Sequence, residues 1–218
     1  MDIRKKFSEE DLNRIKSAVR NAESIISGEI VPVIVNRSAD YHVTNYKAAV
    51  IFASVAFAVI VAIDRYFPEL AVYDPLLMFL LILLAGALGV VVVNVIQPLK
   101  RILIPQGELD YSTRQRAETA FLEEEVFNTR HRTGIMIFIS FFEHEVIVMA
   151  DRGISKVVDQ KEWDDLVSGL TRNIGNGEIV DGIVQAIGRC GEILKEKGFT
   201  KTNDDVNELR EDLRIDEN

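Results

Sequence analysis

The chain has 218 residues, a formal net charge of −9, 48% hydrophobic residues and a single cysteine. A protein that binds the nucleic-acid backbone needs clustered lysine and arginine, so this acidic balance argues against nucleic acid as a partner. One cysteine excludes a disulfide within the chain and a zinc site built on several cysteines. This residue, Cys190, lies in an apolar helical pattern and is expected to be a small, buried side chain. The average hydrophobicity hides two very different regions, because two long runs are almost wholly apolar.

These two apolar runs, residues 46–63 and 76–99, interrupt an otherwise charged sequence. As helices with a rise of about 1.5 Å per residue, they would be about 27 and 36 Å long, against about 30 Å for the hydrocarbon core of a bilayer. The second run carries no charged residue, which argues against a pair of buried core helices. Both runs are therefore predicted to span a membrane. Neither is predicted to be a secretory signal, because the first begins after a polar segment without a cleavage pattern.

Flanking charges predict the orientation of the hairpin. Arg37 and Lys47 precede the first span and Lys100 and Arg101 follow the second, whereas the connecting loop 64–74 holds three acidic residues and one arginine. The positive-inside rule then places both termini in the cytoplasm. The chain is expected to be a multi-pass protein of the inner (cytoplasmic) membrane, with the lipid bilayer as one partner.

Few polar groups lie inside the spans. Asn94 is the one strongly polar residue of the second span, and we expect it to join the two helices or to be solvated at the membrane interface rather than to form a transport site. Small residues would permit close approach of the helices: Ala49, Ala53, Gly86 and Gly89.

Before the hairpin, the sequence predicts one helix and one strand. Apolar residues recur at helical spacing from Ser8 to about Ser27, with Ser8 as the N-cap. Residues 29–35 are rich in β-branched side chains and are expected to form a strand. Pro32 has no N–H to donate, so this strand is predicted to lie at a sheet edge or to carry a bulge.

After the hairpin, the predicted elements are a helix at 112–127, strands at 134–140 and 145–150, and helices at 161–174 and 179–197. The first of these helices is expected to begin at a capping-box pattern of Ser112 with Gln115. The strand 134–140 lacks polar alternation and is expected to be central and covered on both faces. The segments 1–45 and 105–199 are expected to form one split cytoplasmic domain around the hairpin at 46–99. Residues 200–218 are expected to be an acidic, solvated tail, with a short helix through Val206, Leu209 and Leu213 as the alternative.

The blocks 27–35, 132–140 and 146–154, together with Trp163, resemble the TPM domain family. The chain is most similar to the bacterial membrane proteins in which a hydrophobic hairpin interrupts a TPM domain. The resemblance implies an α/β/α sandwich with a small mixed sheet. It also implies a role in assembly or maintenance of membrane complexes, with phosphatase activity and divalent-metal binding attributed to some members. It implies no agreed biochemical function for the hairpin-containing type.

Asp151 is the first candidate for a functional residue, because it lies where a strand ends and a loop begins. The alternative is structural: Asp151 would cap the turn, and Gly153 and Gly134 would serve as structural turn residues. Glu29 and Asp159 would complete an oxygen-rich Ca²⁺ or Mg²⁺ site with Asp151 if all three meet at one end of the sheet. No dedicated metal-binding spacing supports this set, so the sequence specifies no cofactor.

Arg130, His131 and Arg132 form a short basic cluster before the central strand. Arg130 and Arg132 are candidates for contact with a phosphate group or with anionic lipid headgroups, and the alternative is a solvated loop. The hydroxyl residues Thr133 and Ser140 occur in no nucleophile-elbow or triad pattern.

We therefore expect an interaction or complex-maintenance module at the cytoplasmic face of the inner membrane, with a membrane protein as partner. An enzyme is the less favoured interpretation, and it would be a divalent-metal-dependent phosphatase that uses Asp151. The hairpin is also a candidate for self-association, so a homo-oligomer stays open.

Overall fold

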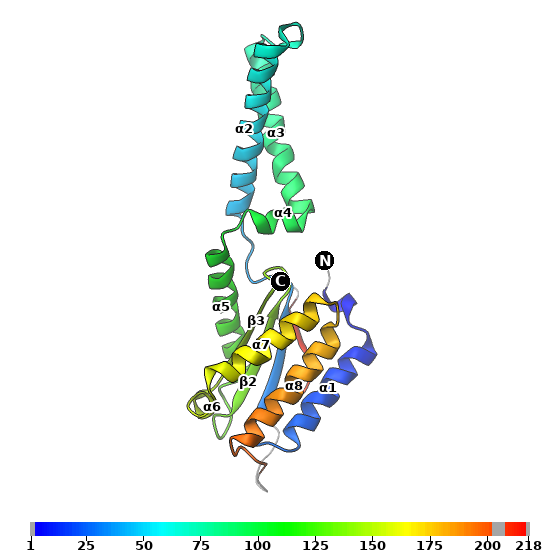
Figure 1. The fold of residues 1–218 in the computed structure, drawn as a ribbon, viewed down its shortest axis with the longest axis vertical. Helices are drawn as coiled ribbons and strands as arrows, with labels where there is room; N and C mark the ends of the chain where they lie inside the picture. The colour runs from blue at the N-terminus through cyan, green and yellow to red at the C-terminus, as the bar shows by residue number, and fades with distance from the viewer. Residues whose placement is uncertain (1–2, 202–207, 217–218) are drawn as a thin grey trace. The chain divides into compact units, whose positions relative to one another are not determined.

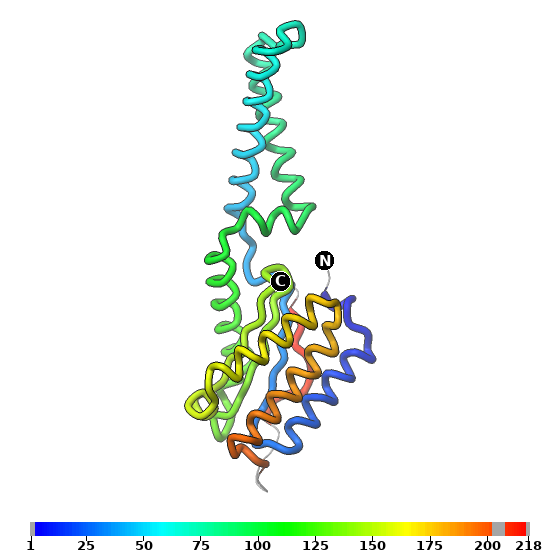
Figure 2. The backbone as a smooth tube through the Cα atoms, viewed as in Figure 1, coloured from blue at the N-terminus to red at the C-terminus, as the bar shows by residue number. Residues whose placement is uncertain are grey.

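The computed structural model describes residues 3–201 and 208–216, and the chain divides into two compact units. The sheet unit comprises Met1–Ser38 and Asp110–Asn218, and the hairpin unit comprises Ala39–Leu109. The chain starts in the sheet unit, leaves it for the hairpin unit and returns (Figures 1 and 2).

Four strands form one mixed sheet in the order β3-β2-β1-β4: β1 (Glu29–Val35), β2 (Gly134–Ser140), β3 (Glu145–Ala150) and β4 (Arg214–Asp216). β1 runs parallel to β2 and to β4, and β3 runs antiparallel to β2. The three strands predicted from the sequence are confirmed with the same bounds. Because β1 precedes the hairpin unit and β2 follows it, two distant segments complete one sheet.

Helices cover both faces of this sheet. α1 (Glu9–Glu23), α7 (Gln160–Gly175) and α8 (Ile179–Glu196) pack on one face, and α5 (Gln106–Glu123) supplies residues to the other (Figure 1). Successive strand residues alternate between the faces: Ile30 and Ile34 point to the first, and Val31, Val33 and Val35 to the second. Every residue of β1 and β2 is buried, so the predicted central position of β2 is confirmed.

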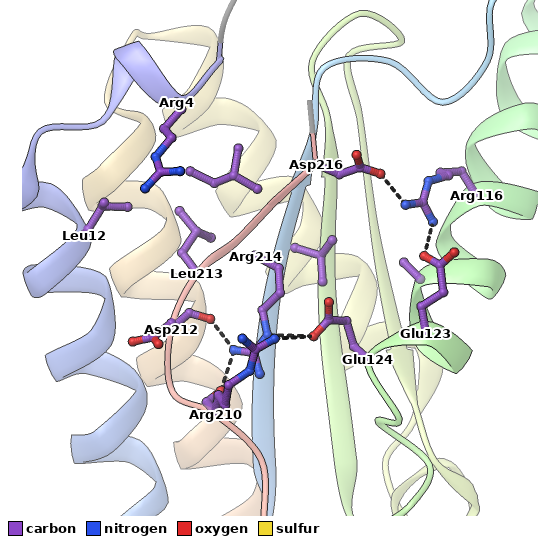
Figure 3. Close-up of a pocket in the computed structure, with 13 residues that line it drawn as sticks. Arg4, Leu12, Arg116, Glu123, Glu124, Arg210, Asp212, Leu213, Arg214 and Asp216 are labelled. Carbon is purple, nitrogen blue, oxygen red and sulfur yellow. Dashed lines mark hydrogen bonds and ion pairs between the residues drawn. The ribbon is translucent and has the colours of Figure 1, made fainter. Parts of the chain in front are cut away.

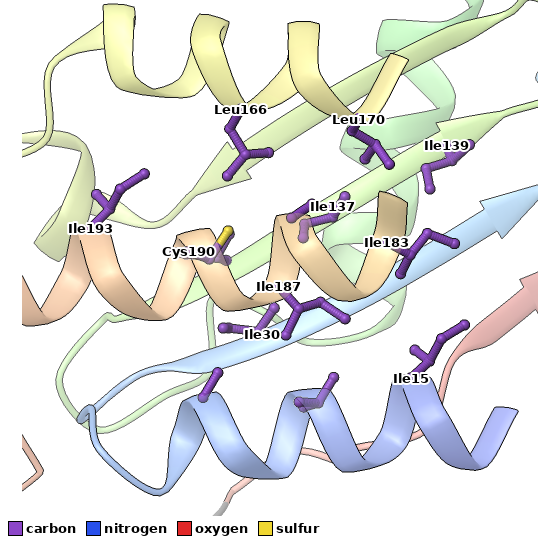
Figure 4. Close-up of a cluster of buried hydrophobic side chains, with 14 of the residues drawn as sticks. Ile15, Ile30, Ile137, Ile139, Leu166, Leu170, Ile183, Ile187, Cys190 and Ile193 are labelled. Carbon is purple, nitrogen blue, oxygen red and sulfur yellow. The ribbon is translucent and has the colours of Figure 1, made fainter. Parts of the chain in front are cut away.

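The larger core lies between the sheet and the three helices. Figure 4 shows Ile30, Ile137 and Ile139 of the strands facing Leu166 and Leu170 of α7, with side chains of α1 and α8 beside them. Full burial of such a side chain stabilises the fold by about 1.5–3 kcal/mol. Cys190 belongs to this core, and burial raises the pKa of its thiol to about 12. The expectation of a small, buried cysteine is confirmed.

The start of α5 differs from the prediction. The expected helix at 112–127 began at a capping pattern on Ser112, but the structure has α5 from Gln106 to Glu123, with Ser112 inside it. Pro105 precedes the first helical residue, and its carbonyl accepts hydrogen bonds from the N–H groups of Glu108 and Leu109. A proline preorganises the backbone for a helix start, and here it overrides the later capping signal.

Pro32 does not place β1 at the outside of the sheet, because β4 lies beyond it. β4 nevertheless pairs only with Val33–Val35. Along the same side of β1, the N–H of Ile30 donates to the carboxyl group of Glu23 over 2.9 Å. Pro32 is two residues further along and faces the same side, where no strand partner needs its missing N–H. β1 is therefore not an edge strand, but β4 covers only its second half on this side.

The expected solvated tail at 200–218 is wrong for residues 208–216. This C-terminal segment contains β4, and Leu213 and Ile215 pack against the larger core. The alternative helix is also absent, since Leu209 and Leu213 lie in irregular backbone and Val206 lies outside the described residues. Two alternating apolar residues, Leu213 and Ile215, are too weak a signal to reveal a strand of three residues.

Ion pairs hold the C-terminal segment. Arg20 of α1 pairs with Glu211 over 2.7 Å, and Lys16 pairs with Asp212 over 2.7 Å. The segment also lines a cavity of about 510 Å³, together with residues of α5 and with Leu12 of α1. Figure 3 shows Arg116 reaching from α5 to Asp216, and Arg214 reaching from β4 to Glu124. The charges that line this cavity are therefore largely compensated from within the chain.

In the hairpin unit, α2 (Val43–Tyr66) and α3 (Pro75–Val95) are long and apolar enough to cross a membrane. Their most apolar stretches have mean hydropathies of 2.3 and 3.1, and only 6% and 17% of those stretches are buried. A core helix of a soluble protein would be mostly buried, so these helices present apolar surface to their surroundings. η2 (Pro68–Leu70) lies in the connecting loop, and the short α4 (Gln97–Ile102) follows α3.

Contacts between α2 and α3 agree with the sequence. A Cβ on Gly86 would lie 3.3 Å from the carbonyl oxygen of Ala49, and one on Gly89 would lie 2.6 Å from the ring of Phe52. The side-chain amide of Asn94 donates to Oδ1 of Asn45 over 3.0 Å. The predicted role of Asn94 as a link between the helices is confirmed.

Replacement of Asn94 by alanine is expected to weaken the association of α2 and α3 by about 1 kcal/mol, because an interhelical amide hydrogen bond is lost. The measurement is a double-mutant cycle with Asn45→Ala, using the free energy of unfolding in mixed detergent and SDS. Since the two amides bond each other, the double variant should lose less than the sum of the single losses. Additive losses would contradict the pairing.

Candidate functional site

Three strands meet at one end of the sheet, and most of the predicted site residues lie there. Glu29 starts β1 opposite Gly134, the first residue of β2. Asp151 directly follows β3, and its N–H donates to the carbonyl of Gly134 over 2.9 Å. Parallel strands start at the same edge, and an antiparallel neighbour ends there. We call this group the strand-end cluster: Glu29, Arg130, Arg132, Gly134, Asp151 and Gly153.

Asp151 caps a short helix and is almost fully buried. It is the N-cap of α6 (Arg152–Ser155), and its Oδ1 accepts a hydrogen bond from the N–H of Arg152 over 2.6 Å. Its other oxygen, Oδ2, is buried and has no hydrogen-bond partner within residues 3–201 and 208–216. The guanidinium of Arg132 lies 3.7 Å from Oδ2, close enough for an ion pair. Asp151 thus has the capping role predicted from the sequence as its structural alternative. Its Oδ2 is not used in that cap.

The two glycines of the strand-end cluster are required by close backbone approach. A Cβ on Gly153 would lie 2.5 Å from the carbonyl oxygen of Arg132, and one on Gly134 would lie 2.0 Å from that of Val126. Arg132 itself has a positive φ of 56°, and its carbonyl accepts the N–H of Gly153 over 3.0 Å. A non-glycine residue in this region of backbone space is uncommon. The turn is therefore fixed by packing between two loops.

Glu29 and Arg130 are connected through a residue that sequence reasoning missed. Oε1 of Glu29 accepts the N–H of Glu208 over 3.0 Å, and Glu208 in turn accepts the backbone N–H of Arg130 over 2.9 Å. Glu208 comes from the C-terminal segment, about 80 residues after Arg130. No sequence signal places it here, because the contact depends on how β4 returns to the sheet.

Asp159 does not join the strand-end cluster. It is the N-cap residue of α7, where Glu162, with Asp159 nearby, raises the pKa of Lys197. Among the described residues, no group of three histidine, cysteine or acidic side chains has the geometry to hold a metal ion. The candidate set of Glu29, Asp151 and Asp159 is therefore not brought together as a metal site.

Comparison with known proteins supports the fold. No protein-family model matches this chain, and no curated protein matches it. The NMR structure of the BA42 protein from the psychrophilic bacterium Bizionia argentinensis aligns with 96% of this chain and 95% of its own, at 17% identity and a TM-score of 0.59. The two chains share a fold. At this identity the likeness says nothing about activity.

The hydroxyl candidates have structural roles. The hydroxyl of Thr129 accepts the N–H of Thr133 over 2.9 Å, which ties the loop before β2. Ser140 lies at the opposite end of the sheet, where its hydroxyl donates to the buried Glu143 and accepts from the hydroxyl of Ser38. Ser140 therefore lies at the wrong end of the sheet to act with Asp151, and Thr133 takes part through its backbone in holding the loop.

Two acidic groups with raised pKa values were missed by the sequence. Burial raises the pKa of Glu23 to about 8, helped by repulsion from Glu29 and Glu211. Burial, together with a hydrogen bond to Asp110, raises the pKa of Glu145 to about 7. Glu23 is near the strand-end cluster through Glu29, whereas Glu145 starts β3 at the far end. Periodicity cannot reveal such shifts, since both glutamates occupy ordinary positions in their helix and strand.

Proposed function

We propose that this chain is a membrane-anchored interaction module of the TPM type, which supports assembly or maintenance of a membrane complex at the cytoplasmic face of the inner membrane. The observation that carries the proposal is the insertion of two exposed apolar helices between β1 and β2 of a sheet unit with its own core. Such a hairpin would return the chain to the side of the membrane it left, so the sheet could close around it.

The chemistry of the strand-end cluster supports interaction over catalysis. Asp151 caps α6, and Arg132 pairs with Asp151. The carboxylate of Glu29 accepts the backbone N–H of Glu208 in the C-terminal segment. Each of these groups has a partner that stabilises the fold. Glu29 also lines a cavity of about 200 Å³, but its carboxylate there accepts the N–H of Glu208. A general acid or base would need to reach a substrate proton from such a cavity.

Cysteine labelling in intact cells tests the topology. Glu69→Cys, in the connecting loop, is expected to react with a membrane-impermeant maleimide from outside. Glu10→Cys and Arg189→Cys should react only after the membrane is opened, because the sheet unit would lie in the cytoplasm. Cys190 is buried and serves as an unreactive background. Labelling of Glu10→Cys and Arg189→Cys from opposite sides would overturn the proposal.

A divalent-metal-dependent phosphatase is the second candidate, favoured by the buried Oδ2 of Asp151 beside Arg132. We expect the purified chain to hydrolyse p-nitrophenyl phosphate with Mg²⁺ or Ca²⁺ no faster than Asp151→Asn does. Asparagine can still accept the N–H of Arg152, so this variant should fold. If the wild type turned over about 100-fold faster than Asp151→Asn, while Asp159→Asn stayed active, the enzyme would replace the interaction module.

A further inference from the structure

β3 is an outer strand of the sheet with an unprotected edge. It is six residues long, and Val146, Ile147, Val148 and Met149 form its apolar centre. Proteins usually protect such an edge with proline, lysine, a bulge or a very short strand. β4 at the opposite edge follows that rule with three residues. β3 carries none of these devices, and all six of its residues are half-buried.

Three residues of β3 direct their backbone groups away from the sheet. The N–H of Asp151 donates to Gly134 in β2, and inward and outward groups alternate along an antiparallel strand. Val146, Val148 and Ala150 therefore present their N–H and C=O groups outward. In the part of the chain that the structure describes, none of these outward groups has a hydrogen-bond partner.

A groove of about 340 Å³ follows this edge. Its wall on one side is α7, where Trp163 and Val167 give apolar surface beside the side chains of Val146 and Val148. On the other side lies Arg114 of α5, whose side chain is 77% exposed and pairs with Glu118. Gln160 and Asp164 of α7 also line the groove. The groove thus combines unpaired backbone groups and an apolar wall with an acidic residue on the α7 side and a basic residue on the α5 side.

We propose that this groove is a docking site for an extended strand of a partner protein, which adds to the sheet beside β3. Main-chain hydrogen bonds to Val146, Val148 and Ala150 would supply affinity, as in other strand-addition complexes. The partner strand would place apolar side chains toward Trp163 and Val167, and a carboxylate on the alternate face toward Arg114. This inference deepens the proposed interaction role, because it names the surface that the role would use.

A second copy of the chain fits the edge less well. The register that pairs all three outward residues sets Val148 against Val148 of the other copy and Val146 against Ala150. It also sets Glu145 opposite Asp151, and directly opposed acidic residues destabilise a strand pair. In addition, the chain leaves each sheet unit after β1, so two copies would leave the joined sheet at opposite ends. A strand from a different protein meets neither obstacle.

A designed peptide tests the site. The probe is a fluorescein-labelled heptapeptide, Glu-Val-Thr-Val-Thr-Val-Glu, whose valines would face α7 and whose glutamates would face α5. We expect saturable binding to the full chain in detergent micelles. The matched variants are Val167→Lys, which puts a charge into the groove, and Ser168→Lys, the exposed neighbour on α7. Val167→Lys should weaken binding at least about tenfold, and Ser168→Lys should leave it unchanged.

Two further measurements identify strand pairing. When the peptide pairs antiparallel to β3, the valines lie opposite Val146, Val148 and Ala150 and their N–H groups face β3. N-methylation of the three valines removes these N–H groups, and it should weaken binding at least about tenfold. In the complex, hydrogen exchange at Val146, Val148 and Ala150 should slow, because these amides gain partners. No saturable binding, or binding that Val167→Lys and N-methylation leave unchanged, would overturn the site. A dimer that Val167→Lys dissolves would assign the edge to a second copy and overturn the choice of partner. None of these measurements depends on membrane topology. A failed binding test would therefore overturn the docking site alone, and a failed labelling test would overturn the proposed function alone.

Discussion

Gly134→Ala is expected to lower the free energy of unfolding of the sheet unit by at least about 3 kcal/mol. A Cβ at this position would lie 2.0 Å from the carbonyl oxygen of Val126 and 2.9 Å from its Cγ1. Val126 is fully buried, so it has no room to retreat. Gly134 is also the residue to which both Glu29 and Asp151 are aligned, and any shift would disturb both neighbouring strands.

The measurement is denaturant unfolding followed by the fluorescence of Trp163, the single tryptophan, which is buried in the core of the sheet unit. Gly188→Ala is the matched control, since a Cβ there meets nothing within 4 Å and lies in the middle of α8. Alanine favours a helix over glycine, so this control should gain up to about 1 kcal/mol. A Gly134→Ala variant as stable as the control would show that Val126 does not rest on Gly134.

The role of Gly134 shows how far the sequence reaches. Gly134 and Gly153 were expected to be structural turn residues, and both are held by close backbone contacts. The β-branched runs revealed β1, β2 and β3, because a strand buried on both faces needs apolar residues at every position. The sequence could not show that the carbonyl of Val126 would be the atom above Gly134, since that contact depends on the path of the loop after α5.

Contacts between distant segments account for the other differences. β4 escaped prediction because three residues carry almost no periodicity. α1 pairs with the residues before it, Glu211 and Asp212, and Arg116 of α5 pairs with Asp216 in β4. The metal set required Asp159 to lie at the same sheet end as Glu29 and Asp151. Among the described residues the three do not form a metal-holding group, and α6 stands between Asp151 and Asp159 in the chain. Glu23 looked like an ordinary residue at the end of an amphipathic helix. Only the fold shows that its carboxyl group is buried against the edge of β1.

Glu23 should make the stability of the sheet unit fall as pH rises from about 5 to about 8. Burial raises its pKa from 4.5 to about 8, and the carboxyl group accepts the N–H of Ile30 over 2.9 Å. Between these two pH values the folded chain keeps a proton that the unfolded chain releases. The stabilisation that comes from protonated Glu23 is therefore fully present below the pKa of Glu23 in the unfolded chain. It is lost as the pH rises through the pKa of Glu23 in the folded chain. At about 1.4 kcal/mol per pKa unit, the loss is about 4–5 kcal/mol.

Glu23→Gln isolates this effect, because the amide oxygen still accepts the N–H of Ile30 and carries no titratable proton. At pH 5 the variant and the wild type should unfold at similar denaturant concentrations, followed by Trp163 fluorescence. At pH 9 the variant should be more stable by several kcal/mol, since the buried charge facing Glu29 and Glu211 is absent. Glu145 also loses stability over part of this range, but it contributes equally to both proteins. A difference between variant and wild type that stays constant from pH 5 to 9 would mean that Glu23 titrates normally, which its burial against Ile30 does not allow.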